Sequence, residues 1–212
     1  MGTARTSEGL TPIVHAAEKQ RVLRDFRDEV LAATNDALLE PLERAARTIE
    51  EDLCVLVEGR LVAGCVCFPS HWRLRDMLGR TIGEVHRRVP GYEADLDAKV
   101  NSFLRRLAPH AVVGRRNFSI HELPDLFAPD APPTIGVAPA DQWLRSERQT
   151  LRRLDKSGAV LFTIRTQQVQ LGALSPEVRT KLAARLRAEP EALIGYRNLT
   201  ERLPVLIDWL AP

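Results

Sequence analysis

Two pairs of strand-like runs, separated by a helical insertion, place the strongest constraint on how this chain folds. Residues 52–58 and 61–68 alternate their side chains along apolar runs and are joined by a tight turn at Gly59, so they predict a β-hairpin. Residues 143–154 and 159–170 predict a second, longer hairpin. Because hairpin strands run antiparallel, the two pairs predict one antiparallel sheet.

The insertion between the two hairpins combines short helices with a further strand. Thr81 and Glu84 have the spacing of a capping box, which predicts a short helix that carries His86 near its end. An apolar stripe predicts a longer helix over residues 93–107, and residues 112–121 predict the third of five strands. Helices inserted between the second and third strands should cover one face of the sheet, with the ligand pocket between them and the strands.

The whole chain, residues 1–212, is expected to form a single domain, because this length is enough to bury a sizeable core. Residues 1–50 should contribute N-terminal helices, including a helix over residues 16–33. Residues 51–171 should form the core and residues 172–212 the C-terminal helices. The predicted fold class is α+β, with a five-stranded antiparallel sheet, helices on one face and flanking helices at both ends of the chain.

The composition argues against several classes of protein. The 30 basic and 28 acidic residues leave a net charge of +2, without the basic excess of a nucleic-acid surface. No apolar run reaches the ~20 residues that cross a membrane, and the N-terminus lacks a signal-peptide pattern. Cys54, Cys65 and Cys67 lie in strand-like runs without zinc-site spacing, which is typical of buried reduced thiols. We therefore expect a cytoplasmic protein that binds neither nucleic acid nor membranes.

A series of motifs follows along the chain in a specific order and spacing. The motifs are Cys67-Phe68-Pro69-Ser70-x-Trp72-Arg73-Leu74, His86-x-x-Val89-Pro90-Gly91-Tyr92, Asn117-Phe118-Ser119-Ile120, Glu147-Arg148-Gln149-Thr150-Leu151 and Ser157-Gly158-Ala159-Val160-Leu161-Phe162-Thr163-Ile164-Arg165-Thr166. This series resembles the haem-dependent oxidative N-demethylase family over roughly residues 41–210. The resemblance implies a PAS-like fold, a haem b cofactor and a monooxygenase activity of the kind that oxidises secondary methylamines.

The resemblance makes His86 the candidate ligand of the haem iron. A neutral imidazole on a short, capped helix beside a pocket suits a proximal haem ligand. Taken without the resemblance, the same residue fits a helix-end histidine that interacts favourably with the helix dipole. Tyr92 and Asn117 belong to the matching motifs and are further candidate haem contacts, while the strand face of Asn117 is equally compatible with exposure to solvent.

Arg148 and Arg165, on the two strands of the second hairpin, are the candidate catalytic residues and further haem contacts. A guanidinium that faces the cofactor could hydrogen-bond bound oxygen or a propionate. The alternative is an exposed arginine paired with Glu147. Since successive strand side chains point to opposite faces, only one of Glu147 and Arg148 can face the pocket, and the need for a donor over oxygen favours Arg148.

The sequence thus predicts a haem b monooxygenase that oxidises a small molecule, such as an amine, with molecular oxygen. It contains no glycine-rich phosphate loop and no four-cysteine cluster, so electrons are expected from a separate reductase protein.

The chain departs from the family pattern at His71, where arginine is expected, and at Gln167-Gln168, where an aromatic residue is usual. Two alternatives therefore stay open: a haem-binding PAS-like sensor without turnover, and a scaffold that has lost haem. His71 itself fits either a distal histidine or a surface cap.

Overall fold

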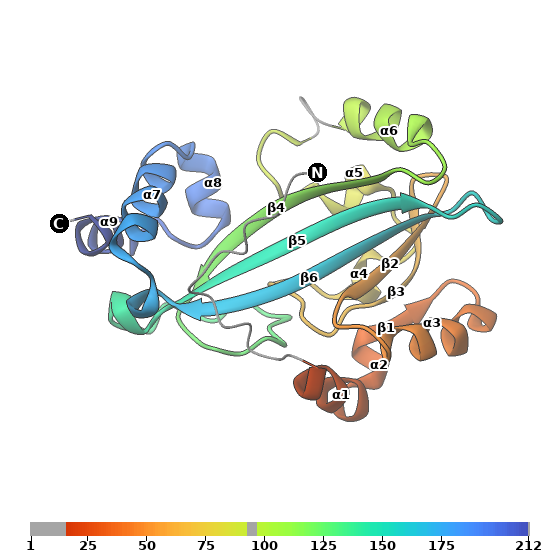
Figure 1. Ribbon diagram of the computed structural model, residues 1–212, viewed down its shortest axis with the longest axis horizontal. Coiled ribbons are helices and arrows are strands. Elements are labelled where there is room, and N and C mark those ends of the chain that lie inside the picture. The colour runs from red at the N-terminus through yellow and green to blue at the C-terminus, as the bar shows by residue number, and fades with distance from the viewer. Residues whose placement is uncertain (1–15, 93–96, 212) are drawn as a thin grey trace, which may run out of the picture.

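The computed structural model describes residues 16–92 and 97–211, which form an α+β fold around a six-stranded sheet (Figure 1). The strands are β1 (Leu31–Ala33), β2 (Asp52–Val57), β3 (Arg60–Cys65), β4 (Val112–His121), β5 (Trp143–Arg153) and β6 (Val160–Gln170). They pair antiparallel in the order β1-β3-β2-β6-β5-β4. The predicted α+β class and the antiparallel sheet are confirmed, whereas the number of strands is not.

The additional strand, β1, lies where an apolar stripe predicted continuous helix over residues 16–33. The helical part ends earlier, as α1 (Ala16–Asp25) and α2 (Arg27–Val30), and β1 then pairs with β3. Leu31 and Ala32 are both buried, but in two different cores on opposite faces of the sheet. A short run that is buried on both faces looks the same in sequence as a turn of buried helix, so the prediction of five strands was wrong by one edge strand.

Helices pack on both faces of the sheet and beyond one end of it. They are α3 (Leu39–Ala46), α4 (Leu74–Met77), α5 (Ile82–Val85), α6 (Asp97–Arg106), α7 (Pro176–Arg187), α8 (Glu191–Tyr196) and α9 (Leu203–Leu210), besides α1 and α2. In the first core, α1–α3 pack on the face that carries Leu53, here called the N-terminal face. In the second, α4–α6 pack on the face that carries Cys54, here called the insertion face. Figure 1 shows α7–α9 gathered at one end of β4–β6, where they form the third core.

None of the helices in the described ranges has the length and apolar character that crossing a membrane requires.

The strand order explains why the insertion covers a whole face. β3 lies near one edge of the sheet, next to β1, whereas β4 forms the opposite edge. The chain that connects them must therefore cross β2, β6 and β5, and α4–α6 lie along this connection. Leu74, Ile82 and Leu104 from these helices are buried in the same core as Cys54 and Val160 of the sheet. The crossing places the helical insertion directly over the sheet, as predicted.

A buried cluster of charged groups holds the chain where it leaves β3. Asp52 is fully buried, and its two carboxylate oxygens accept hydrogen bonds of 2.9 Å from the backbone N–H groups of Cys67 and Phe68. Lys19 is also fully buried, with its Nζ 3.9 Å from Asp52 Oδ1. The buried Arg145 donates to the carbonyl of Phe68. Because a buried polar group without a partner costs about 1–3 kcal/mol, these bonds decide the path of the chain here.

Burial raises the pKa of Asp52 to about 6 from its ordinary 3.8, while Lys19 and the two backbone amides oppose the rise. The fold therefore favours the protonated acid. The stability contributed by this shift is fully present below pH 3.8 and is lost as the pH rises through about 6. Above that pH the ionised carboxylate depends on Lys19 as its nearest cation.

We predict that Lys19→Met lowers the free energy of unfolding by about 3 kcal/mol or more at pH 8 and by clearly less at pH 5, because protonated Asp52 needs no counter-charge. Urea denaturation at the two pH values measures the difference. Lys181→Met is the matched control, since it removes an exposed lysine that pairs with Glu177 on the helix surface, and it should change little at either pH. Equal losses at pH 5 and pH 8 in Lys19→Met would contradict the prediction.

Candidate functional site

The helical insertion and the sheet enclose a cavity of about 230 Å³, here called the His86 cavity. Most of its lining is apolar and aromatic, and its polar side chains are few. The lining consists of Leu56, Ile82, His86, Tyr92, Val100, Phe103, Leu104, Val113, Gly114, Arg115, Gln149, Leu151 and Phe162. An apolar cavity with a few polar groups is the usual form of a small-molecule or cofactor site.

His86 reaches this cavity because a capping box fixes the short helix α5. Thr81 Oγ1 accepts a hydrogen bond from the Glu84 amide at 3.2 Å, and the Glu84 carboxylate accepts one from the Thr81 amide at 2.7 Å. The capping box predicted from the sequence is therefore present. The helix ends after about one turn, and His86 is its half-buried C-cap residue.

Contacts with Ile82 and Tyr92 hold the imidazole of His86 in its orientation. Its Nδ1 lies 2.9 Å from the carbonyl oxygen of Ile82. Since a carbonyl oxygen only accepts, Nδ1 carries a proton, and in the neutral form of the ring the lone pair is on Nε2. Tyr92 stacks on the ring with centroids 4.7 Å apart and planes inclined by 11°. Metal-binding histidines usually donate their other ring N–H to a carbonyl or carboxylate, so this arrangement suits an iron ligand.

A row of polar side chains runs along the insertion face to the mouth of the cavity. Arg115 Nε on β4 donates to Gln149 Oε1 on β5 at 2.7 Å, and Gln149 Nε2 donates to Glu147 Oε2 at 2.9 Å. Glu147 Oε1 in turn lies 3.5 Å from Nε of the buried Arg145. Sequence reasoning missed Arg115 and Gln149 as site residues. The alternation of β5, which buries Leu151 on the same face, is the signal that could have found Gln149.

Arg148 and Arg165 lie on the N-terminal face, away from the His86 cavity. They sit directly opposite each other on β5 and β6. Arg148 forms an ion pair with Glu51 at 3.3 Å, and Arg165 pairs with both Glu50 and Glu51 in the connection between α3 and β2. Neither arginine belongs to the described lining of the cavity.

The uninterrupted register of β5 explains this placement. Gln149 lines the His86 cavity, so Glu147 shares its face and Arg148 points the other way. The expectation that Arg148 faces the pocket and Glu147 points away is therefore wrong. Asn117 is the cross-strand partner of Glu147 and also lies on the insertion face, beyond the residues that line the cavity. Roles for Asn117, Arg148 and Arg165 at a cofactor stay predictions, whereas His86 and Tyr92 do come together.

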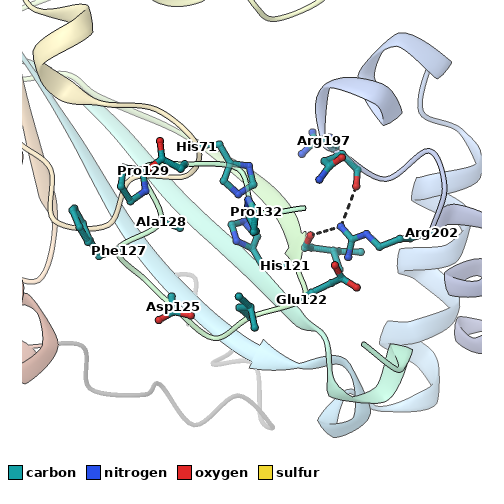
Figure 2. A pocket seen from close by; sticks show the side chains of 14 residues that line it. His71, His121, Glu122, Asp125, Phe127, Ala128, Pro129, Pro132, Arg197 and Arg202 are labelled. Atoms are coloured by element: carbon teal, nitrogen blue, oxygen red, sulfur yellow. Dashed lines mark hydrogen bonds between the residues drawn. The ribbon is translucent and has the colours of Figure 1, made fainter. Parts of the chain in front are cut away.

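A second cavity, of about 210 Å³, lies between the end of β4 and the C-terminal helices (Figure 2). His71 and His121 line it side by side with ring centroids 5.0 Å apart. Arg197 and Arg202 line the side of the C-terminal helices, and Arg202 donates to the backbone carbonyls marked in Figure 2. The described linings of the two cavities share no residue, so His71 lines the second cavity and not the His86 cavity. His71 is half-buried, and the residue at the N-cap of α4 is Arg73 instead.

The two histidines of the second cavity are held in the neutral state. His121 Nε2 lies 2.9 Å from Ser119 Oγ and 3.3 Å from Ser70 Oγ. Burial, with the nearby Arg145 as the next cause, lowers the pKa of His121 to about 3. Burial also lowers the pKa of His71. Within the described residues no three His, Cys, Asp or Glu side chains are grouped as they would be around a metal ion.

Comparison with known protein families gives one match that extends over nearly the whole chain. Residues 14–207 match the family described as haem-dependent oxidative N-demethylase, alpha subunit-like. The matched range includes every strand of the sheet, the helical insertion and both cavities.

We predict that the imidazole of His121 stays neutral down to about pH 4 in the folded protein. Its folded pKa of about 3 lies below the ordinary 6.5, so the associated stability is present above pH 6.5 and is lost as the pH falls toward 3. A proton NMR titration of the ring C–H signals, assigned by their loss in His121→Gln, should show no midpoint for His121 between pH 5 and 7. A midpoint in that range would mean that the ring is not buried as described.

Proposed function

The chain belongs to the haem-dependent oxidative N-demethylase, alpha subunit-like family, and on this premise we propose that it binds haem b through His86. The observation that carries the proposal is the orientation of the His86 ring. Its Nδ1–H is bonded to the Ile82 carbonyl, so the lone pair lies on Nε2, and the ring lines an apolar cavity. Imidazole nitrogen is a common axial ligand of haem iron.

The chemistry of the lining fits a porphyrin. Leu56, Leu151 and Phe162 offer apolar surface to a flat macrocycle, His86 offers the ligating nitrogen, and Arg115 offers a positive charge at the edge. The volume of about 230 Å³ is below the about 300–1,000 Å³ of typical ligand pockets. We therefore expect a porphyrin to fill the cavity and to extend beyond its mouth.

The sheet supports the PAS-like part of the proposal. Without β1, the strand order is β3-β2-β6-β5-β4, and the helical insertion lies between the second and third of these strands in the chain. This is the arrangement that the family resemblance led us to expect, with the ligand between the insertion and the sheet. The edge strand β1 is an addition at one side of the sheet, and none of its residues lines the cavity.

Bound haem would supply the oxygen chemistry, and the residues of the chain would hold and orient it. The hydrogen bond from Nδ1 to Ile82 would keep His86 in the ligating tautomer and raise the basicity of Nε2. Tyr92 would keep the ring from rotating, since it stacks on one side of it. The apolar lining would keep bulk water away from the reacting centre.

We propose a small N-methylated amine as the substrate, because the family is named for oxidative N-demethylation. In that reaction an N-methyl group, molecular oxygen, two electrons and two protons give the demethylated amine, formaldehyde and water. The sequence carries no flavin, nicotinamide or iron–sulfur signature, so we propose that a separate reductase protein supplies the electrons.

A second candidate function is haem binding without turnover. One observation favours it: the described residues that line the His86 cavity include no carboxylate, which an ammonium group of an amine substrate would need as its partner. Glu147 shares the insertion face, but it is bonded to Gln149 and lies beside Arg145. Formaldehyde release from dimethylamine, measured with a chemical reductant and oxygen, separates the two candidates.

We predict that His86→Gly, reconstituted with hemin, loses the Soret band of histidine-ligated haem while its far-ultraviolet circular dichroism is unchanged. Added imidazole should restore the band, because it replaces the missing ring in the space that the substitution leaves. The ferric and ferrous absorption spectra provide the measurement.

His110→Asn is the control for this experiment. His110 is an exposed residue outside both cavities, with a φ of 65° that asparagine tolerates. Its spectrum should match that of the parent protein. An unchanged axial-ligand spectrum in His86→Gly would refute ligation by His86.

A further inference from the structure

Arg115 is the one permanently charged side chain among the described residues that line the His86 cavity. It is exposed on β4, the edge strand of the sheet, so its guanidinium stands at the mouth rather than in the interior. An apolar cavity with a single fixed cation at its mouth matches a ligand with an apolar body and an anionic edge.

The guanidinium of Arg115 is bonded on one side only. Its Nε donates to Gln149 Oε1 at 2.7 Å. Its two terminal amino groups form no hydrogen bond or ion pair with any described residue. These groups form the planar fork that matches the two oxygens of a carboxylate.

The row of polar side chains behind Arg115 holds it in place before any ligand binds. Gln149 is buried, and its amide is fixed between Arg115 Nε and Glu147 Oε2. Glu147 is fixed in turn beside the buried Arg145. An arginine that is already oriented loses less conformational entropy on binding, so its contact contributes more to affinity. Gln149 and Glu147 thus act as positioning residues.

We propose that Arg115 binds a carboxylate of the ligand in the His86 cavity. Resting on the proposed function, this carboxylate is a propionate of haem. The bond is charge-assisted but lies at an exposed mouth, so salt screens it. Arg148 and Arg165, which the sequence suggested for a propionate, face the other way and are paired with Glu50 and Glu51.

The chain provides a matched control in Arg116. It is the next residue on β4, it is equally charged and exposed, and it pairs across the strands with Arg148 on the N-terminal face. A variant at this position changes the net charge of the protein as much as a variant at Arg115. Of these two arginines, Arg115 lines the His86 cavity and Arg116 does not.

The test compares hemin with its propionate dimethyl ester in the parent protein and in Arg115→Met. We expect Arg115→Met to release hemin to excess apomyoglobin about tenfold faster than the parent, which corresponds to about 1.4 kcal/mol. The dimethyl ester has no carboxylate, so both proteins should release it at the same rate. Arg115→Lys, which keeps the charge without the fork, should lie between them. Raising the ionic strength should speed the release of hemin from the parent more than from Arg115→Met.

The outcomes separate this inference from the proposed function. Faster release of hemin from Arg116→Met, equal to that from Arg115→Met, would reduce the effect to overall charge and overturn the inference. Equal release from parent and Arg115→Met, with His86→Gly still losing the ligated spectrum, would overturn the inference and leave the proposed function standing. If the parent binds neither hemin nor its ester, both are overturned.

A double-mutant cycle tests the positioning role of Gln149. Gln149→Leu alone should speed hemin release severalfold, because Arg115 loses the partner that orients it. In the Arg115→Met background the same substitution should have no further effect on hemin release. An equal effect in both backgrounds would mean that Gln149 acts on the cavity directly, and it would overturn the positioning role.

Discussion

The buried carboxylate of Asp52 is the interaction on which the rest of the arrangement depends. It accepts the N–H groups of Cys67 and Phe68 where the chain leaves β3, and Arg145 binds the Phe68 carbonyl at the same point. Because these groups are buried, each hydrogen bond left unmade would cost about 1–3 kcal/mol. Lys19 brings the counter-charge from α1, so one cluster joins the N-terminal helices, β2 and β5 at the start of the helical insertion.

From this start the insertion has to cross the sheet, because β4 lies at the far edge. The crossing lays α4–α6 over the insertion face and leaves the His86 cavity beneath them. The capping box ends α5 at His86 after about one turn. There the carbonyl of Ile82 accepts both the backbone N–H and the ring Nδ1–H of His86. The geometry of one helix end therefore selects the tautomer in which Nε2 carries the lone pair.

Side chains on the two faces of β5 make different kinds of contact. Glu147 and Gln149 extend the polar row that reaches the cavity mouth at Arg115. Arg148, between them in sequence, faces the opposite side and ties the α3–β2 connection to the sheet through Glu51. Such half-exposed ion pairs contribute little to stability on their own. The same alternation therefore separates the polar row, for which we propose a role in ligand binding, from ion pairs that hold the chain connection on the other face.

The sequence by itself determined the local structure of this protein: the two hairpins, the capping box that carries His86, and the antiparallel sheet. Those features depend on residues a few positions apart, whose turn and cap chemistry is readable in order. Only the tertiary structure decided the sixth strand, the face of Arg148 and the pairing of Arg115 with Gln149, which is 34 residues away. The contact of Arg145 with Phe68 spans 77 residues. Register and burial depend on such distant partners, and a shift of one residue moves every side chain of a strand to the other face.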